Sequence, residues 1–280
     1  MFRANGTKSY TLENVRRFPA TRVASRLSFA SIYGRGRLGD GWCSCPVAVR
    51  AVPKNPSHST TSNRILSRLS REDFASLEPH LEAVALPVRK QLENSRKRID
   101  QVYFIEAGFA SVVANGSNKP SIEVGIIGRE GMTGLAVLLG DERASHATYI
   151  QVAGKGLRIS AAKLREADER SPTLHRAMLR YANAFLLQTT TTALANGRSK
   201  INERLARWLL MAADRVDGTE LPLTHEFLGL MLGTYRPGVT KAVQALEKEG
   251  LIAPRRGGIT ILDRKGLEKR SNGTYVRLEA

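Results

Sequence analysis

The side chains best suited to chemistry lie between residues 235 and 241. Four of them fall early in an apolar-patterned helix and away from its apolar stripe: Tyr235, Arg236, Thr240 and Lys241. An arginine on such a face can donate two hydrogen bonds to one guanine in the major groove of DNA. These residue types therefore predict a surface that binds nucleic acid.

Three further residues are candidates for contacts with phosphate groups. Arg255 and Arg256 lie at a predicted turn between two strands, where cations contact phosphates and position a protein without reading sequence. Thr224 precedes the first helix of the segment, and its hydroxyl and the helix amides behind it are suited to hold another phosphate.

The elements that must position these side chains follow from the pattern of residues 221–262. A first apolar-patterned helix ends at Gly233, which allows the chain to turn, and a second helix is predicted from Tyr235 to Glu249. Two strands joined by Gly257 and Gly258 come next. Helix, glycine turn, helix and hairpin are typical of a winged helix-turn-helix. The alternative is a winged helix used for protein contacts, with a solvated basic face.

Composition supports a nucleic-acid partner. The 280 residues are 42% hydrophobic and 25% charged, which fits about two globular domains. Lys plus Arg is 43 against 26 for Asp plus Glu, a formal charge of +17. Such an excess favours nucleic acid first and an anionic membrane surface second, and with the winged helix-turn-helix the expected nucleic acid is double-stranded DNA. Because no apolar run reaches the ~18 residues of a spanning helix, we expect a cytoplasmic protein that acts away from membranes.

Enzyme chemistry is not indicated. The sequence contains no HExxH motif, no Walker loop and no evident nucleophile–base set. The five histidines show no metal-ligand spacing, and two cysteines are too few for a four-thiolate site. We therefore expect no catalytic residues, no metal site and no cofactor.

Residues 1–62 form a separate basic segment. They hold ten basic and two acidic residues, a net charge of +8, and show no sustained helical or strand period. Disorder, an organelle transit peptide and translation from an upstream start codon all fit this composition. A GxGxxG match at 34–39 is followed by Gly and Pro rather than by a helix, and Cys43 and Cys45 have no second ligand pair. We interpret both features as incidental.

The ordered region begins near Asn63 with short helical patterns that end near Pro79. Glycine-punctuated, β-rich runs then extend to about Ser160, which indicates a β-roll, jelly roll or barrel. The predicted strands are Val84–Val88, Val102–Ile105, Phe109–Val113, Ile122–Ile127, Tyr149–Val152 and Leu157–Ile159, with a hairpin turn at Asn115–Asn118.

A long helix is predicted to follow the β region, because Pro172 after Ser171 is a strong helix start. Leu174, Met178, Tyr181 and Phe185 recur at spacings of 4, 3 and 4. This register fits a helix that pairs with a partner chain, and the alternative is one face of an ordinary buried helix. We predict a break at Asn196-Gly197 and a second helix at about Ile201–Val216.

The order of these elements resembles the Crp/Fnr family of transcription regulators over residues 63–270. The stretch Phe227–Ile252 is similar to the family signature GxSRETVxRxLxxLExxGLI. The resemblance implies that Arg236 occupies the guanine-reading position and Lys241 the second basic reading position. Pro237 stands where many members have a base-contacting glutamate, so we expect an operator different from the usual family half-site.

The resemblance also implies that the β domain is similar to a cyclic-nucleotide-binding domain. Gly134 is retained, but Leu135 replaces the family glutamate, and Ser145 stands at the arginine position beside His146. A bound phosphate would lose a charge-assisted partner there, so the pocket is expected to be degenerate and ordinary cyclic AMP is not the expected effector. Thr189 and Thr190 match positions that offer hydroxyls to the nucleotide base, or they are simply helix surface.

The resulting fold class is α+β, and the function expected from the resemblance is a homodimeric, sequence-specific DNA-binding regulator. RNA polymerase is the further partner that the family implies, and the effector stays unknown. The predicted domains are a basic extension over 1–62, a sensor domain over 63–172, a dimerisation helix over 173–196, a winged helix-turn-helix domain over 197–270 and a tail over 271–280.

Overall fold

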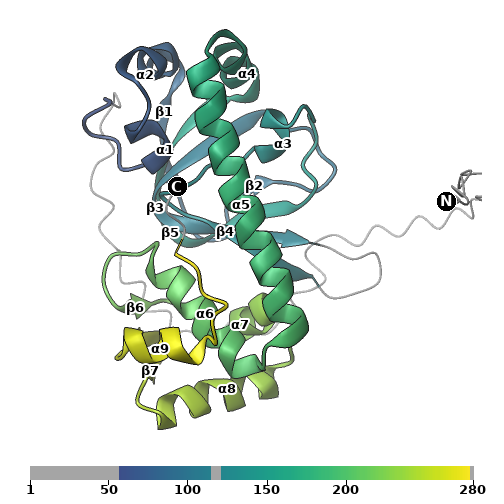
Figure 1. Cartoon of the computed structure of the whole chain (residues 1–280), viewed down its shortest axis with the longest axis vertical. Coiled ribbons are helices and arrows are strands. Elements are labelled where there is room, and N and C mark those ends of the chain that lie inside the picture. Colours follow the sequence, from purple (N-terminus) through teal and green to yellow (C-terminus); the bar gives the residue numbers. More distant parts are fainter. Residues whose placement is uncertain (1–56, 115–120, 278–280) are drawn as a thin grey trace, which may run out of the picture. The chain divides into compact units, whose positions relative to one another are not determined.

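The computed structural model describes residues 57–114 and 121–277 (Figure 1). The predicted basic segment up to residue 56, with its GxGxxG match and both cysteines, lies outside the described residues. The predicted turn at Asn115–Asn118 lies outside them as well. Within the described part, no helix is both long and apolar enough to cross a membrane.

The N-terminal half is built on an antiparallel sheet with the order β1-β5-β3-β4, and β2 also pairs with β5. The strands are β1 (Glu82–Leu86), β2 (Gln91–Glu93), β3 (Gln101–Ala114), β4 (Ile122–Ile127) and β5 (Ala147–Ser160). The predicted strand Ile122–Ile127 is confirmed. In this order β4 is an edge strand, and its outer edge needs cover.

Two long strands were each predicted as two short ones, and glycines explain the error. The predicted runs Val102–Ile105 and Phe109–Val113 belong to β3, which continues through a bulge at Gly108. Likewise, β5 continues through Gly154, where an added Cβ would lie 1.8 Å from the carbonyl oxygen of Ala107. Glycine at this position therefore permits a close approach of two strands rather than a turn.

Helices cover the sheet on the side that holds the largest core of this half. They are α1 (Arg64–Ser67), α2 (Arg71–Leu77) with a 3-10 turn at Glu78–His80, α3 (Leu135–Leu138) and α4 (Ala161–Arg170). The core contains Phe74, Leu77, Phe104, Leu157 and Leu164. Sequence patterns did not predict β2, α3 or α4, because these elements are short or have few apolar residues.

Helix α5 spans Pro172–Arg198, and Figure 1 shows it running from the sheet to the C-terminal helices. Its predicted start is confirmed, because the hydroxyl of Ser171 accepts a hydrogen bond from the amide of Leu174. The predicted break at Asn196-Gly197 is wrong, since the helix continues to Arg198. A single glycine costs a helix only about 1 kcal/mol relative to alanine, and the helix there is held by buried Ala195.

The predicted partner seam on α5 needs a correction. Leu174, Met178 and Tyr181 are buried against the sheet domain of the same chain, and Phe185 packs beside them. The hydroxyl of Tyr181 donates to the carbonyl oxygen of Met132 at 2.6 Å. These residues are therefore one face of an ordinary buried helix, which was the alternative interpretation of their spacing. The large apolar residues that α5 exposes are others: Leu179, Leu186, Leu187 and Leu194.

The C-terminal part contains a winged helix-turn-helix. Its elements are α6 (Ile201–Ala213), β6 (Glu220–Leu221), α7 (His225–Leu232), α8 (Arg236–Lys248), β7 (Ile252–Arg255), β8 (Gly258–Ile261) and α9 (Arg264–Arg270). The small sheet has the order β6-β8-β7. The predicted helices and hairpin are confirmed, as is the α+β class with a β-sheet domain, a long helix and this motif. β6 and α9 were not predicted.

Candidate nucleic-acid interface

Helix α8 is held by one face and exposes the other. Val239, Ala242, Val243 and Leu246 are buried in the core of the C-terminal domain. Gly233 ends α7 with φ 56°, a left-handed conformation that glycine adopts without strain. Tyr235 is the N-cap of α8, and Pro237 lies in its first turn, where its missing N–H costs no helical hydrogen bond.

The exposed face carries the residues predicted to read DNA. Tyr235 is 84% exposed, and Arg236 and Lys241 are also exposed. Within the described residues, neither cation has an acidic partner at salt-bridge distance, so both charges are available. The Thr240 hydroxyl donates to the carbonyl oxygen of Arg236 at 3.1 Å, which holds this side chain against the first turn of the helix.

The other predicted contacts come from separate elements. Arg255 and Arg256 are exposed at the tip of the β7–β8 hairpin, which turns at Gly257 with φ 78°. The Nε of Arg255 donates to the hydroxyl of Thr260 at 3.1 Å. Thr224 is the N-cap of α7, and its hydroxyl accepts from the amide of Phe227 at 3.2 Å. The predicted cap is confirmed, and the phosphate contacts stay predictions.

In the sheet domain, the amide of Gly134, one of the predicted pocket residues, is bonded to a carboxylate of the chain itself. Gly134, with φ 78°, donates its N–H to Oε1 of Glu93 at 2.8 Å. The hydroxyl of Thr148 donates to Oε2 of the same carboxylate at 2.5 Å. Burial raises the pKa of Glu93, and these two hydrogen bonds and nearby His146 partly offset the rise. Sequence reasoning missed Glu93, because nothing in the pattern around it indicates this contact.

Of the remaining predicted pocket residues, His146 lies close enough to Glu93 to affect its pKa, and no hydrogen bond joins the other described ones to that carboxylate. Leu135 is half-buried in α3, while Ser145 and His146 are exposed. The hydroxyls of Thr189 and Thr190 each donate to the carbonyl oxygen of Leu186 within α5. A cleft of about 400 Å³ lies elsewhere, between α2, α4 and the start of α5. The described residues contain no group of three His, Cys, Asp or Glu side chains placed to hold a metal.

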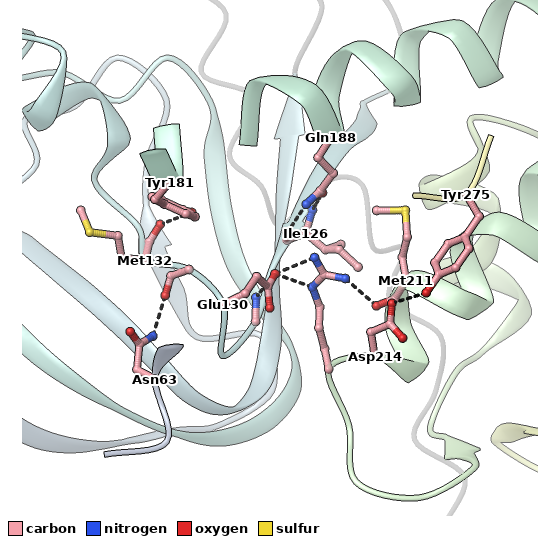
Figure 2. A network of polar contacts seen from close by, with 12 residues as sticks. Asn63, Ile126, Glu130, Met132, Tyr181, Gln188, Met211, Asp214 and Tyr275 are labelled. Carbon is pink, nitrogen blue, oxygen red and sulfur yellow. Dashed lines mark hydrogen bonds and ion pairs between the residues drawn. The ribbon is translucent and has the colours of Figure 1, made fainter. Parts of the chain in front are cut away.

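The winged helix-turn-helix domain is attached to the sheet domain through buried polar contacts, drawn in part in Figure 2. Glu130 and Arg215 form an ion pair at 2.5 Å with side chains that are 8% and 4% exposed. Arg215 follows α6 and also donates to the carbonyl oxygen of Met211, in the last turn of that helix, at 2.6 Å. The side chain of Arg215 lies against Gly128, where an added Cβ would meet it at 2.5 Å.

A second buried contact joins α6 to β4. The indole Nε1 of Trp208 donates to Oε1 of Glu123 at 2.5 Å, and both side chains are buried. Trp208 packs edge-on against Phe109 of the sheet domain and Phe227 of α7. Burial raises the pKa of Glu123 to about 8, although hydrogen bonds with Ser111 and Trp208, and then the charges of Arg215 and Arg207, lower it in part. At neutral pH this carboxyl is therefore mostly protonated.

Comparisons with known proteins agree with this arrangement. Residues 203–270 match the family model described as a Crp-like helix-turn-helix domain. A transcriptional regulator of the Crp/Fnr family from Eubacterium rectale ATCC 33656 is similar, with TM-score 0.60 and 17% identity over 75% of this chain and 98% of that one. FixK2 from Bradyrhizobium japonicum has TM-score 0.60 and 16% identity, covering 68% of this chain and 96% of that one.

A CRP-family transcriptional regulator from Thermus thermophilus is similar too, with TM-score 0.57 and 18% identity over 71% of this chain and 99% of that one. A search of curated protein sequences gave no match. Residues 203–270 therefore form a Crp-like helix-turn-helix domain. The order of sheet domain, long helix and winged helix is the fold of the similar Crp/Fnr regulators.

The raised pKa of Glu123 predicts a stability that depends on pH. The folded protein keeps this proton up to about pH 8, whereas the unfolded chain loses it near its ordinary value of 4.5. The contribution of Glu123 is therefore complete below pH 4.5 and is lost as pH rises to 8, by at most about 1.4 kcal/mol per pH unit. Denaturant unfolding of Glu123→Gln and wild type between pH 5 and 8 measures the difference.

The variant should show the shallower fall, because a neutral amide has no proton to lose. Glu72→Gln, at an exposed site on α2, serves as the control and should keep the wild-type slope. Parallel slopes for wild type and Glu123→Gln would contradict the assignment.

Proposed function

We propose that the protein binds a palindromic operator as a homodimer, with the first turns of α8 in the major groove. The observation that carries this proposal is Arg236, an exposed cation without an acidic partner among the described residues, in the first turn of a helix whose opposite face is buried. Arg236 reads a guanine, and Lys241, Thr240 and Tyr235 lie beside it for further contacts. Thr224, Arg255 and Arg256 bind phosphates and set the orientation.

The exposed leucines of α5 support the dimer. Leu179 and Leu186 are seven residues apart, as are Leu187 and Leu194, and seven residues are about two helical turns. These side chains therefore share one side of the helix, away from the side that packs on the sheet domain. Such a repeat fits a self-complementary helix pair around a two-fold axis. A dimer of this kind would place two winged helices on two half-sites and would activate or repress through RNA polymerase.

The sheet domain is proposed to have a degenerate nucleotide pocket. The amide of Gly134 is already bonded to the carboxylate of Glu93, and a phosphate in the same place would meet a carboxyl group rather than an arginine. Ser145 supplies no positive charge. The effector, where one acts, is therefore of another class than ordinary cyclic AMP.

Site selection from a random duplex library, with purified protein and no added ligand, tests the DNA readout. We expect a palindrome with half-sites about one helical turn apart. On that operator Arg236→Ala should cost about 1–3 kcal/mol of binding free energy and relax specificity at one base position. Arg256→Ala should weaken binding to all duplexes evenly and reduce the slope of log affinity against log salt concentration by about 1. Fluorescence anisotropy on single-base operator variants measures both, and equal losses on every duplex would refute these roles.

The dimer is tested by charge on the exposed face of α5. Leu186→Arg places a cation at the centre of the proposed seam, so sedimentation should show a monomer and a weakened affinity for the palindrome. Leu139→Arg is the matched control, because Leu139 is 62% exposed and lies after α3 rather than on α5. A Leu186→Arg protein that stays dimeric would show that the subunits associate through another surface.

The pocket is tested by thermal unfolding with cyclic AMP. A ligand that binds only the folded state raises its stability in proportion to the logarithm of ligand concentration. We expect no change in Tm at about 1 mM cyclic AMP, a concentration at which even a site with a Kd of about 10 μM would give a clear rise. A concentration-dependent rise would mean that Glu93 moves aside and that the nucleotide site is functional.

A further inference from the structure

The DNA-binding domain packs against the sheet domain and is not connected to it through α5 alone. Its core includes two residues of the sheet domain, Phe109 and Ile126. Gly233, in the turn between α7 and α8, lies against Ile122 of β4, where an added Cβ would meet that side chain at 2.7 Å. The turn that orients the recognition helix thus rests on the sheet domain.

Two buried polar pairs between the domains restrict how the DNA-binding domain is oriented on the sheet domain. Glu130–Arg215 joins the loop after β4 to the end of α6, and Glu123–Trp208 joins β4 itself to the middle of α6. Both pairs are buried, where hydrogen bonds are strong and an alternative orientation would leave charged or polar groups unpaired. They therefore permit one position of α6 and disfavour sliding or rotation.

The same loop and strand are also fixed to α5, which carries the proposed dimer seam. Gln188 donates to the carbonyl oxygen of Ile126 at 3.1 Å and accepts from its amide at 2.6 Å. Tyr181 holds Met132 as described above, and Asn63 donates to the carbonyl oxygen of Gly131 at 2.8 Å. Figure 2 shows Tyr181, Met132 and Asn63 on one side of Glu130 and the Gln188–Ile126 contact beside it. These buried bonds are linked through the backbone of residues 126–132, and together they connect α5 to α6.

We propose that the interdomain pairs Glu130–Arg215 and Glu123–Trp208 fix the separation of the two recognition helices, and so determine which half-site spacing the dimer accepts. This inference rests on the proposed function. In a two-fold dimer the separation depends on the dimer axis and on where each winged helix sits relative to it. The four residues are positioning residues, since their side chains are buried between the two domains and away from the exposed face of α8.

The test is a spacing series of the selected operator, with the half-sites at the selected distance and with one or two base pairs added or removed. Wild type should lose at least about tenfold in affinity at each wrong spacing. Glu130→Gln/Arg215→Met removes both charges together, so it leaves no buried unpaired charge and retains an acceptor for the amide of Gly128. This variant should bind all spacings within about threefold of one another.

Two further variants keep the test decisive. Trp208→Phe retains an aromatic ring but loses the N–H donor to Glu123, so it should also flatten the dependence of affinity on spacing. It provides the test if the double variant fails to fold. Arg129→Gln removes an ion pair with Asp217, which is 87% exposed. That pair also spans the two domains, but its carboxylate is open to water while the Arg129 side chain is 25% exposed. A pair screened in this way contributes little, so the wild-type profile should persist.

Affinity for a duplex with a single half-site, together with the sedimentation mass, separates this inference from the function on which it rests. Unchanged single-site affinity and dimer mass with a flattened profile support the role of the pairs. A wild-type profile in both the folded double variant and Trp208→Phe overturns it, as does a wild-type protein indifferent to spacing. Loss of single-site binding by wild type would instead refute the DNA readout.

Discussion

The outer edge of β4 has backbone groups that no other strand of the described sheet pairs, and the rest of the structure is arranged around covering them. An uncovered edge invites pairing with other chains. Here the amide side chain of Gln188 takes the place of a neighbouring strand by bonding both the N–H and the carbonyl oxygen of Ile126. These two hydrogen bonds hold α5 against the sheet, and α6 and α7 pack against the same strand. One strand of six residues thereby positions the long helix and the DNA-binding domain together.

Elements whose signals are local could be predicted from the sequence. The winged helix-turn-helix was recognised because Thr224, Gly233 and the Gly257-Gly258 turn act on their immediate neighbours, and the apolar stripes of α7 and α8 have a regular period. The start of α5 at Pro172 was visible for the same reason. The candidate DNA-reading residues followed, because a helix with one buried face necessarily exposes the other.

Features that depend on distant contacts could not be predicted in this way. The seam of Leu174, Met178 and Tyr181 has the period expected for a partner chain, yet the same period serves equally well against a sheet of the same chain. Only the location of the sheet decides between the two. The pairing of Glu93 with Gly134, of Glu123 with Trp208 and of Glu130 with Arg215 joins residues 41 to 85 positions apart, and no periodicity reports such contacts.

The carboxylate of Glu93 has a consequence for how such a regulator would be controlled. In the proposed degenerate pocket, a domain that bonds the amide of Gly134 with its own side chain would not respond to the level of a soluble anion. Occupancy of the operator would then follow the amount of protein in the cell, set by synthesis and degradation. Two chains must associate before both half-sites are bound, so operator occupancy would rise more steeply than in proportion to protein concentration at low concentration. Such a regulator would respond to changes in its own concentration.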